Sequence, residues 1–492
     1  MADNSNNQWK TLDKDLGRVY LIENATQYVS RPLVGFGISL VFIVLVGLGA
    51  LLFFGQQSNT LVIAVAAIFG AYMALNIGAN DVANNMGPAV GANAVTMGGA
   101  ILIAAIAESA GALLAGGDVV TTIAKGIIDP AGIAEVHIFV WAMLAALLSA
   151  ALWLNLATAL GAPVSTTHSI VGGVMGAGIA AAGFSAVNWA TMSKIAASWV
   201  ISPVLGGVVA ALFLAFIKWR IIYREDKLAA ARIWVPVLIA IMVAAFSTYL
   251  AVKGLKRIVK IELETALLIG LGLGVLSYLI TRPIIARQSE GLENRNKSLK
   301  RLFVIPLVIS AALLSFAHGA NDVANAVGPL AAIVHAVEIG DSSGRVDIPI
   351  WVMLIGAFGI SFGLFLFGPK LIRMVGNQIT KLNAMRAYCV SLSAAITVII
   401  ASTLGLPVSS THIAVGAVFG VGFFREWHME HRVKLHLKKQ KTGKTVAAAE
   451  RKRRKLVRRS HFLTILAAWV ITVPAAAILS GLIFTLLRLV FA

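Results

Sequence analysis

The feature that most constrains this chain is a series of long apolar segments that recurs over most of its 492 residues. A segment of about 20 mostly apolar residues is long enough to cross the hydrocarbon core of a bilayer as a helix. The chain is also 58% hydrophobic and only 13% charged, far from the composition of a soluble globular protein. We therefore predict an all-α integral membrane protein with about 12 transmembrane segments, multi-pass in the cell (inner) membrane.

An internal duplication divides the chain into two repeats. Residues 78–88 read GANDVANNMGP and residues 319–329 read GANDVANAVGP, nine identities in eleven positions at an offset of 241. Residues 160–168 read LGAPVSTTH and residues 404–412 read LGLPVSSTH, seven identities in nine at an offset of 244. Because both motifs recur in the same order and at nearly the same spacing, the duplication covers a structural unit.

The number of apolar segments predicts the relative orientation of the repeats. Seven such segments separate the start of the first copy from the start of the second, and an odd number of crossings inserts the two copies in opposite orientations. The segments at 169–183 and 412–424 are too short to cross alone, which indicates interrupted or re-entrant helices. The predicted organisation is a soluble tail at 1–32, a first membrane segment at 33–60, repeat 1 at 61–217, connecting helices and basic loops at 218–301, and repeat 2 at 302–491 with a basic cytoplasmic loop at 425–460.

The charge of the chain is concentrated in a few places. Residues 425–460 contain 14 of the 41 Lys and Arg residues, and further basic clusters lie at 218–232 and 282–301. Cytoplasmic loops collect Lys and Arg and are attracted to anionic lipid. This distribution therefore predicts cytoplasmic loops beside the membrane rather than nucleic-acid binding. Cys389 is the single cysteine, which excludes disulfides within the chain and cysteine-based metal sites.

The GANDVAN motif places a carboxylate and amides on one helix face. Asn84 lies four residues after Asn80 and three after Asp81, and the second copy supplies Asn321, Asp322 and Asn325. An intramembrane carboxylate is costly unless it is paired or faces a polar cavity. We therefore expect cation binding at Asn80, Asp81, Asn321 and Asp322, with Na⁺ at the two aspartates, and substrate contacts from Asn84 and Asn325. Polar contacts between helices are the alternative, and the flanking Gly and Pro residues predict an interrupted helix.

The second motif predicts an anion site. A proline, three hydroxyls and a histidine precede an apolar segment, as at a helix start buried in the membrane. The free N–H groups and the positive dipole end of such a helix attract an anion, and phosphate fits this description. The candidate substrate ligands are Ser165, Thr166, Thr167, Ser409, Ser410 and Thr411; simple capping of the helix end is the alternative. His168 and His412 are either proton carriers or structural residues.

The balance of charge predicts coupled transport. Neither motif contains Arg or Lys, so cations must neutralise the two aspartates before a divalent anion can bind. This favours symport with Na⁺ or H⁺ over a passive anion pore. Glu108 is a further intramembrane acid, either a cation ligand or proton acceptor or a salt-bridged residue, and its place in the second copy falls near Ile360.

The duplicated motifs resemble those of the inorganic phosphate transporter (PiT) family over roughly residues 60–490. The resemblance implies an inverted-repeat α-helical transporter, usually dimeric, that moves phosphate with Na⁺ in many members and with H⁺ or as a metal phosphate in some bacterial ones. It places Asp81, Asn84, Asp322, Asn325, Ser165, Thr166, Ser409 and Ser410 in the site. Glu108 resembles a family glutamate of the first repeat; many members also have an acid in the second repeat, which this sequence lacks.

We therefore predict a cation-coupled symporter of inorganic phosphate that works by alternating access and needs no cofactor beyond the transported Na⁺ or H⁺. Its expected partners are phosphate, membrane lipid, anionic lipid near 425–460 and a second copy of the chain, but not nucleic acid. Three alternatives remain: a permease for sulfate or another oxyanion, a channel, and an intramembrane hydrolase that uses Asp81 and Asp322 as a dyad rather than a transporter.

Overall fold

The computed structural model describes residues 34–55, 59–133, 135–160, 164–254, 259, 261–341, 346–378, 382–439 and 459–491. The predicted tail at 1–32 and most of the predicted basic loop, residues 440–458, lie outside this range. Within it all regular secondary structure is helical, apart from one isolated bridge between Ile128 and Val187. The all-α prediction is confirmed.

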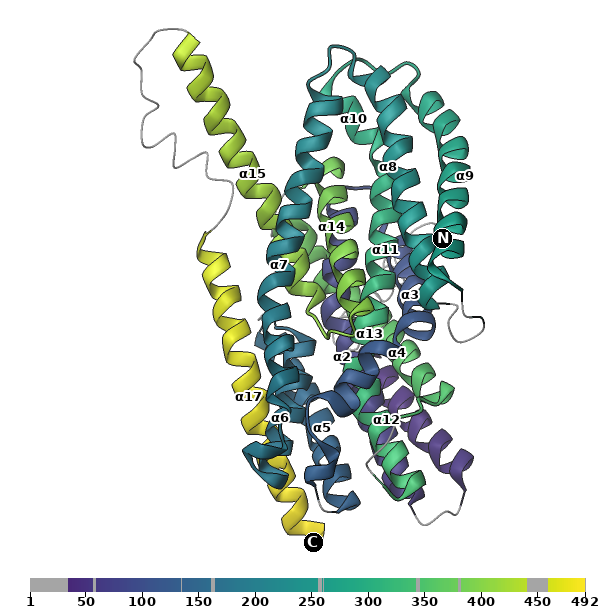
Figure 1. Ribbon diagram of the computed structural model, residues 1–492, viewed down its shortest axis with the longest axis vertical. Helices are drawn as coiled ribbons and strands as arrows, with labels where there is room; N and C mark the ends of the chain where they lie inside the picture. Colours follow the sequence, from purple (N-terminus) through teal and green to yellow (C-terminus); the bar gives the residue numbers. More distant parts are fainter. Residues whose placement is uncertain are drawn as a thin grey trace, which may run out of the picture.

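The α-helices follow one another along the described part of the chain (Figure 1). A first helix, Val34–Phe54, precedes them. They are α2 (Thr60–Gly91), α3 (Met97–Ala115), α4 (Gly117–Thr121), α5 (Val136–Leu160), α6 (Thr166–Ala182), α7 (Trp189–Ile217), α8 (Lys227–Tyr249), α9 (Leu263–Ser289), α10 (Asn296–Leu302), α11 (Val304–Asp322), α12 (Ala324–Ile339), α13 (Ile350–Gln378), α14 (Ala384–Thr403), α15 (Ser410–Lys439) and α17 (Arg459–Phe491).

Eleven helical segments of the described chain are long and apolar enough to span a bilayer. The outward sides of α9 and α17 expose apolar side chains such as Leu268 and Leu482, as expected for helices that face lipid. Helices α6 and α15, which contain the two segments predicted to be too short, are not among the eleven. Both begin inside the protein, where Thr166 and Ser410 are buried. The expected re-entrant arrangement is therefore present.

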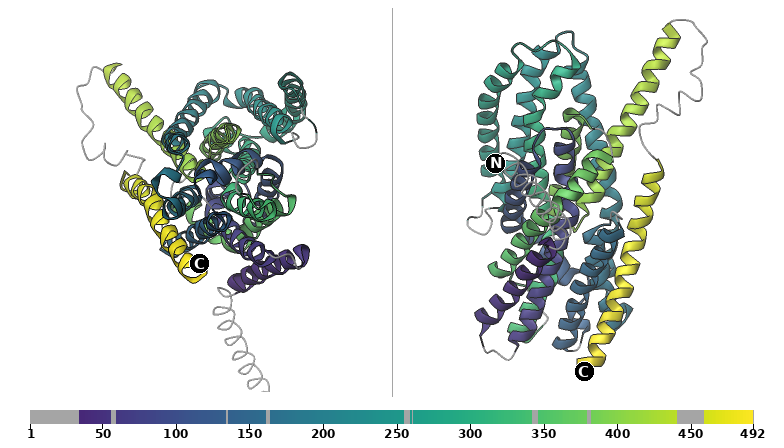
Figure 2. Two further views of the ribbon diagram at one scale, coloured as in Figure 1. Left: turned by 60° about the horizontal axis from the view of Figure 1, so that its bottom comes forward. Right: turned by 180° about the vertical axis from the view of Figure 1, so that it is seen from behind.

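The two repeats exchange helices. Helix α2 packs along α13, α3 along α11, α6 along α17 and α7 along α15, so each partnership joins one repeat to the other. Figure 2 shows α15 and α17 along the same flank of the bundle. The end of α2 at Gly91 and the start of α10 at Asn296 line the same cavity. Because α10 directly precedes α11, α2 ends where its repeat counterpart α11 begins, and the two run in opposite directions.

The glycines of the first motif permit close helix crossings. A Cβ at Gly78 would lie 1.8 Å from the carbonyl oxygen of Ile360, and one at Gly319 would lie 2.1 Å from that of Glu108. The predicted helix interruption is wrong for the first repeat, because α2 continues through the motif and includes Pro88. It is wrong for the second repeat as well, because Val323 between α11 and α12 keeps α-helical angles and donates to the carbonyl oxygen of Gly319, and α12 includes Pro329. Membrane helices tolerate Pro where neighbouring groups satisfy the freed backbone.

The glycines after the second motif have the same function. Gly172 and Gly176 face the backbone of α17, and Gly416 and Gly420 face that of α7, at distances that leave no room for a Cβ. Small residues at such crossings let the backbones of membrane helices approach closely. These glycines therefore hold the starts of α6 and α15 in the interior.

Candidate functional site

Four chain segments bring the two motifs of both repeats together. Asp81 lies in the middle of α2 and Asp322 at the end of α11, while Thr166 and Ser410 begin α6 and α15. All four side chains are buried. The two motifs of both repeats, which lie far apart in the sequence, therefore form one site.

The residues before these two helices cap them. The Ser165 hydroxyl accepts a hydrogen bond from the backbone N–H of His168 at 3.2 Å, and Ser409 does the same for His412 at 3.3 Å. Ser and Thr are preferred caps because they satisfy N–H groups that have no partner within the helix. The capping that the sequence offered as an alternative is thus present at these two serines.

Asp81 binds hydroxyl groups from both repeats. Thr166 Oγ1 donates to its Oδ2 at 2.7 Å, and Thr411 Oγ1 donates to its Oδ1 at 2.9 Å. Asn84 Nδ2 in turn donates to Thr411 Oγ1 at 2.8 Å. This carboxylate therefore connects the starts of α6 and α15.

Asp322 has a different set of neighbours. Ser410 Oγ donates to its Oδ2 at 3.3 Å, and His318 Nε2 lies 3.1 Å from the same oxygen. Its Oδ1 is buried and has no hydrogen-bond partner in the described part of the chain. Nearby, Asn325 Nδ2 donates to Thr167 Oγ1 at 3.2 Å, while Thr167 itself donates to the carbonyl oxygen of Val408.

His318 is the central residue that the sequence reasoning missed. Its Nδ1 lies 3.1 Å from Glu108 Oε1, and its Nε2 lies 4.0 Å from Asp81 Oδ2 in addition to its contact with Asp322. Asn85 Nδ2 also donates to Glu108 Oε1, at 3.0 Å. The signal was available, because His318 directly precedes the second GANDVAN motif, where the first copy has Ile77.

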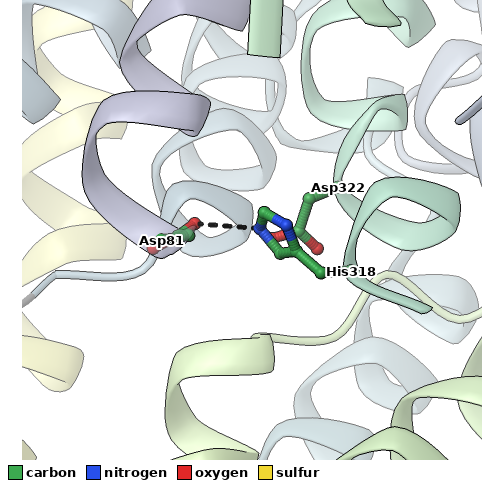
Figure 3. Close-up of side chains that lie close together, drawn as sticks. All are labelled: Asp81, His318 and Asp322. Carbon is green, nitrogen blue, oxygen red and sulfur yellow. Dashed lines mark ion pairs between the residues drawn. The ribbon is translucent and has the colours of Figure 1, made fainter. Parts of the chain in front are cut away.

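Three of these groups could surround one small cation. Ligand atoms of Asp81, His318 and Asp322 lie within 4.8 Å of one another, and all three residues are buried (Figure 3). His318 also changes the charge argument: among the groups that the structure pairs with the site carboxylates, it is the one that can become positively charged. The cluster can therefore hold either a cation or a proton.

The two predicted cation ligands Asn80 and Asn321 lie outside this cluster. Asn321 Nδ2 donates to Ser402 Oγ and to the carbonyl oxygen of Leu406, and its Oδ1 accepts from the N–H of Val408. It thereby holds the segment that leads into α15. Asn80 Nδ2 is buried without a partner in the described chain, and the segment equivalent to Leu406 falls within residues 161–163, outside the described residues.

The motif histidines pack against tryptophans. The ring of His168 lies 3.8 Å from that of Trp199, and the ring of His412 lies 3.5 Å from that of Trp469, measured between centroids. The two imidazoles meet edge to face at 4.5 Å. This packing fixes the starts of α6 and α15 against each other and favours the structural role for these histidines.

Comparison with known proteins agrees with this geometry. Residues 77–480 match the Phosphate transporter family. A protein of Helicobacter pylori strain J99 that is named a phosphate permease is 46% identical, with 94% of this chain and 97% of that protein covered. One of Pyrococcus abyssi with the same description is 37% identical over 86% of this chain and 97% of its own length.

A solved structure shares the fold. It is described as the sodium-dependent phosphate transporter, is 35% identical, and superposes with a TM-score of 0.78 over 87% of this chain and all of that one. Proteins of this kind are transporters rather than enzymes, which sets aside the aspartate-dyad hydrolase. The duplicated motifs, the paired half-sites and these similarities together show that the chain belongs to the phosphate transporter family.

Proposed function

We propose that this protein is a symporter that carries inorganic phosphate together with Na⁺ or H⁺ across the cell (inner) membrane by alternating access. The observation that supports this most directly is the meeting of two buried aspartates with the hydroxyl-rich starts of two inverted helices. One part of the site suits a cation, and the other suits an oxyanion.

The cation part is the group formed by Asp81, His318 and Asp322. Two carboxylates in a buried site repel each other and an approaching anion, and a bound cation or proton reduces both repulsions. Oxygen ligands suit Na⁺, and the description of the solved relative as sodium-dependent favours Na⁺. Glu108 reaches this group through His318, so a proton on the histidine would have three acidic neighbours, Glu108, Asp322 and Asp81.

The anion part consists of Thr166, Thr167, Ser410 and Thr411 at the starts of α6 and α15. A helix start offers unpaired N–H groups and a positive dipole end, both of which stabilise a phosphate. Asn84 and Asn325 already contact hydroxyls of this set, at 2.8 and 3.2 Å. They are therefore placed to orient these hydroxyls and to donate to a phosphate themselves.

The hydrogen bonds suggest how cation and phosphate binding are coupled. A hydroxyl has one proton to donate, and both Thr166 and Thr411 donate theirs to Asp81. A cation on the Asp81 carboxylate competes for the same oxygens and releases these protons to a phosphate. Each ligand then raises the affinity for the other, which is the condition for symport.

Uptake of labelled phosphate into proteoliposomes tests this function. We expect accumulation that follows an imposed Na⁺ or H⁺ gradient and that is lost in Asp81→Asn and Asp322→Asn, because the uncharged amide no longer attracts the cation. Ser277→Ala, in the lipid-facing helix α9, is the control. Uptake that ignores both gradients contradicts symport, and full inhibition of labelled phosphate uptake by equimolar sulfate favours the sulfate permease.

Two further parts of the proposal concern partners. We propose that the protein forms a homodimer, as the resemblance to phosphate transporters implies. We also propose that the basic segment 425–460 faces the cytoplasm beside anionic lipid. Cross-linking in native membranes and protease protection of this segment test the two statements separately.

A further inference from the structure

A basic cavity of about 820 Å³ lies at the end of the molecule where α7 ends and α10 begins. This is the end shown at the top of Figure 1, opposite the C-terminus. Its lining contains five basic residues, Lys218, Lys297, Lys300, Arg386 and Arg425, and no Asp or Glu is found among the described residues that form it. We refer to it as the basic cavity.

Four of these basic side chains lack acidic partners. In the described part of the chain, Lys297, Lys300, Arg386 and Arg425 form no ion pair with a carboxylate. Arg386 and Arg425 are both partly buried, and they are close enough for their charges to repel each other. Placing like charges together away from bulk water costs free energy that a bound anion would recover.

The start of α14 adds a further feature that attracts anions. Asn383 caps this 20-residue helix by accepting from the backbone N–H of Arg386 at 3.1 Å. Asn383, Ala384 and Met385 all line the basic cavity. The first N–H groups of a helix have no partner within it and stabilise an anion, so the helix start and the unpaired cations act on the same space.

We propose that the basic cavity binds a soluble anion with two or more phosphoryl groups, at a site separate from the one that contains Asp81 and Asp322. The volume lies in the range of cavities that hold small molecules. A single phosphate dianion would neutralise only the two partly buried arginines and leave the exposed Lys297 and Lys300 for a second phosphoryl group. Guanidinium groups bind phosphoryl oxygens through two parallel hydrogen bonds, which suits Arg386 and Arg425 to this class of ligand.

The basic cavity shares helices with the candidate transport site. Gly91 lies on α2, ten residues after Asp81, or about 15 Å along the helix axis. Arg425 lies on α15, which begins at Ser410, and Arg386 lies on α14, which ends beside Asn321. If the proposed transport function holds, movement of these helices during transport changes the shape of both the transport site and the basic cavity. Occupancy of the basic cavity therefore regulates phosphate flux.

Binding of tripolyphosphate to the purified full chain in detergent, measured by calorimetry, tests the site. We expect saturable binding that Arg386→Gln with Arg425→Gln weakens by at least about tenfold, because each lost group makes charge-assisted hydrogen bonds. Arg386→Lys with Arg425→Lys keeps the charges and retains part of the affinity. Asp81→Asn leaves the lining of the basic cavity intact and retains saturable binding. Unfolding temperatures of all variants establish that they are folded.

Three results would overturn the proposal. The first is unchanged binding of tripolyphosphate in the double Gln variant. The second is loss of binding in Asp81→Asn, which would place the polyanion in the transport site. The third is binding only to a diphosphorylated lipid in mixed micelles. Flux is then measured in proteoliposomes with tripolyphosphate on one side or the other. Binding without any phosphate flux refutes the transport function and leaves the basic cavity established; flux that tripolyphosphate does not alter refutes the regulatory role.

Discussion

The two aspartates of the duplicated motif occupy different surroundings although their motifs are nearly identical. Asp81 accepts hydrogen bonds from two threonines, one in each repeat. Asp322 accepts one from Ser410 and lies beside His318. Equal motifs therefore do not make equal half-sites: the residue that precedes the motif is His318 in the second copy, where it contacts Asp322, and Ile77 in the first.

Two buried polar residues, Glu108 and His318, have apolar counterparts in the other repeat, and these two residues contact each other. Gly78 contacts the backbone of Ile360 in the same way that Gly319 contacts that of Glu108, which makes Ile360 the counterpart of Glu108. His318 in turn corresponds to Ile77 through the repeat offset. One half of the molecule therefore buries Glu108 against His318, while the other has Ile77 and Ile360 in one hydrophobic cluster.

The largest expected loss of stability comes from removing the contact between Glu108 and His318. Glu108→Ile leaves His318 and Asn85 without their acceptor, and removal of one partner of a buried ion pair costs about 3–5 kcal/mol. We expect the double variant Glu108→Ile with His318→Ile to recover part of this loss, because it copies the Ile77–Ile360 pair of the other half while Asn85 still lacks its acceptor. Chemical unfolding in detergent measures both, and a double variant as unstable as Glu108→Ile alone contradicts the pairing.

The hydroxyl partners of the two aspartates provide the next test. Thr166→Val removes a hydrogen bond of 2.7 Å to Asp81, while Ser410→Ala removes one of 3.3 Å to Asp322. Hydrogen bonds to charged groups contribute about 1.5–3 kcal/mol, so Thr166→Val should lie at the upper end and Ser410→Ala below it. Thermal unfolding and the KM for phosphate uptake report the difference, and equal effects would mean that the two half-sites are equivalent.

Alanine substitution of the glycines at the helix crossings should destabilise the protein by similar amounts in both repeats. Gly78→Ala and Gly319→Ala each force a Cβ against a backbone carbonyl, and overpacking of this kind costs about 1–3 kcal/mol. Gly98→Ala in α3 is the matched control, since nothing lies within 4 Å of its added Cβ. Unfolding measurements that show a loss in only one of the two repeats would show that the crossings are not equivalent.

The smallest effect is expected where the repeats mirror each other. Ser109 and Ser361 occupy equivalent positions, and their hydroxyls hydrogen-bond to each other at 2.7 Å. Either Ser→Ala change should cost about 0.5–1.5 kcal/mol, as for an ordinary hydrogen bond, with little further cost in the double variant. Additive losses in a double-mutant cycle would show that the two serines do not act on each other.

Much of the fold was accessible from the sequence. Long apolar segments indicate membrane helices because the bilayer requires every backbone group to be satisfied within the helix. The repeat and its offset identified Asp81 with Asp322 and Ser410 with Thr166, and the structure brings all four together. The helix interruption was predicted in both repeats and is present in neither, because α2 continues through Pro88 and the helix formed by α11 and α12 continues through Pro329.

What the sequence determined by itself is the class of molecule, the duplication and the residue types of the site, since these depend on local composition and spacing. Only the tertiary structure decided which copies of those residues meet. Helices are exchanged between repeats, so Thr411 of the second copy binds Asp81 of the first, and Glu108 binds His318 across 210 residues. Such contacts depend on how closely helices cross, which the glycines permit but no linear pattern specifies.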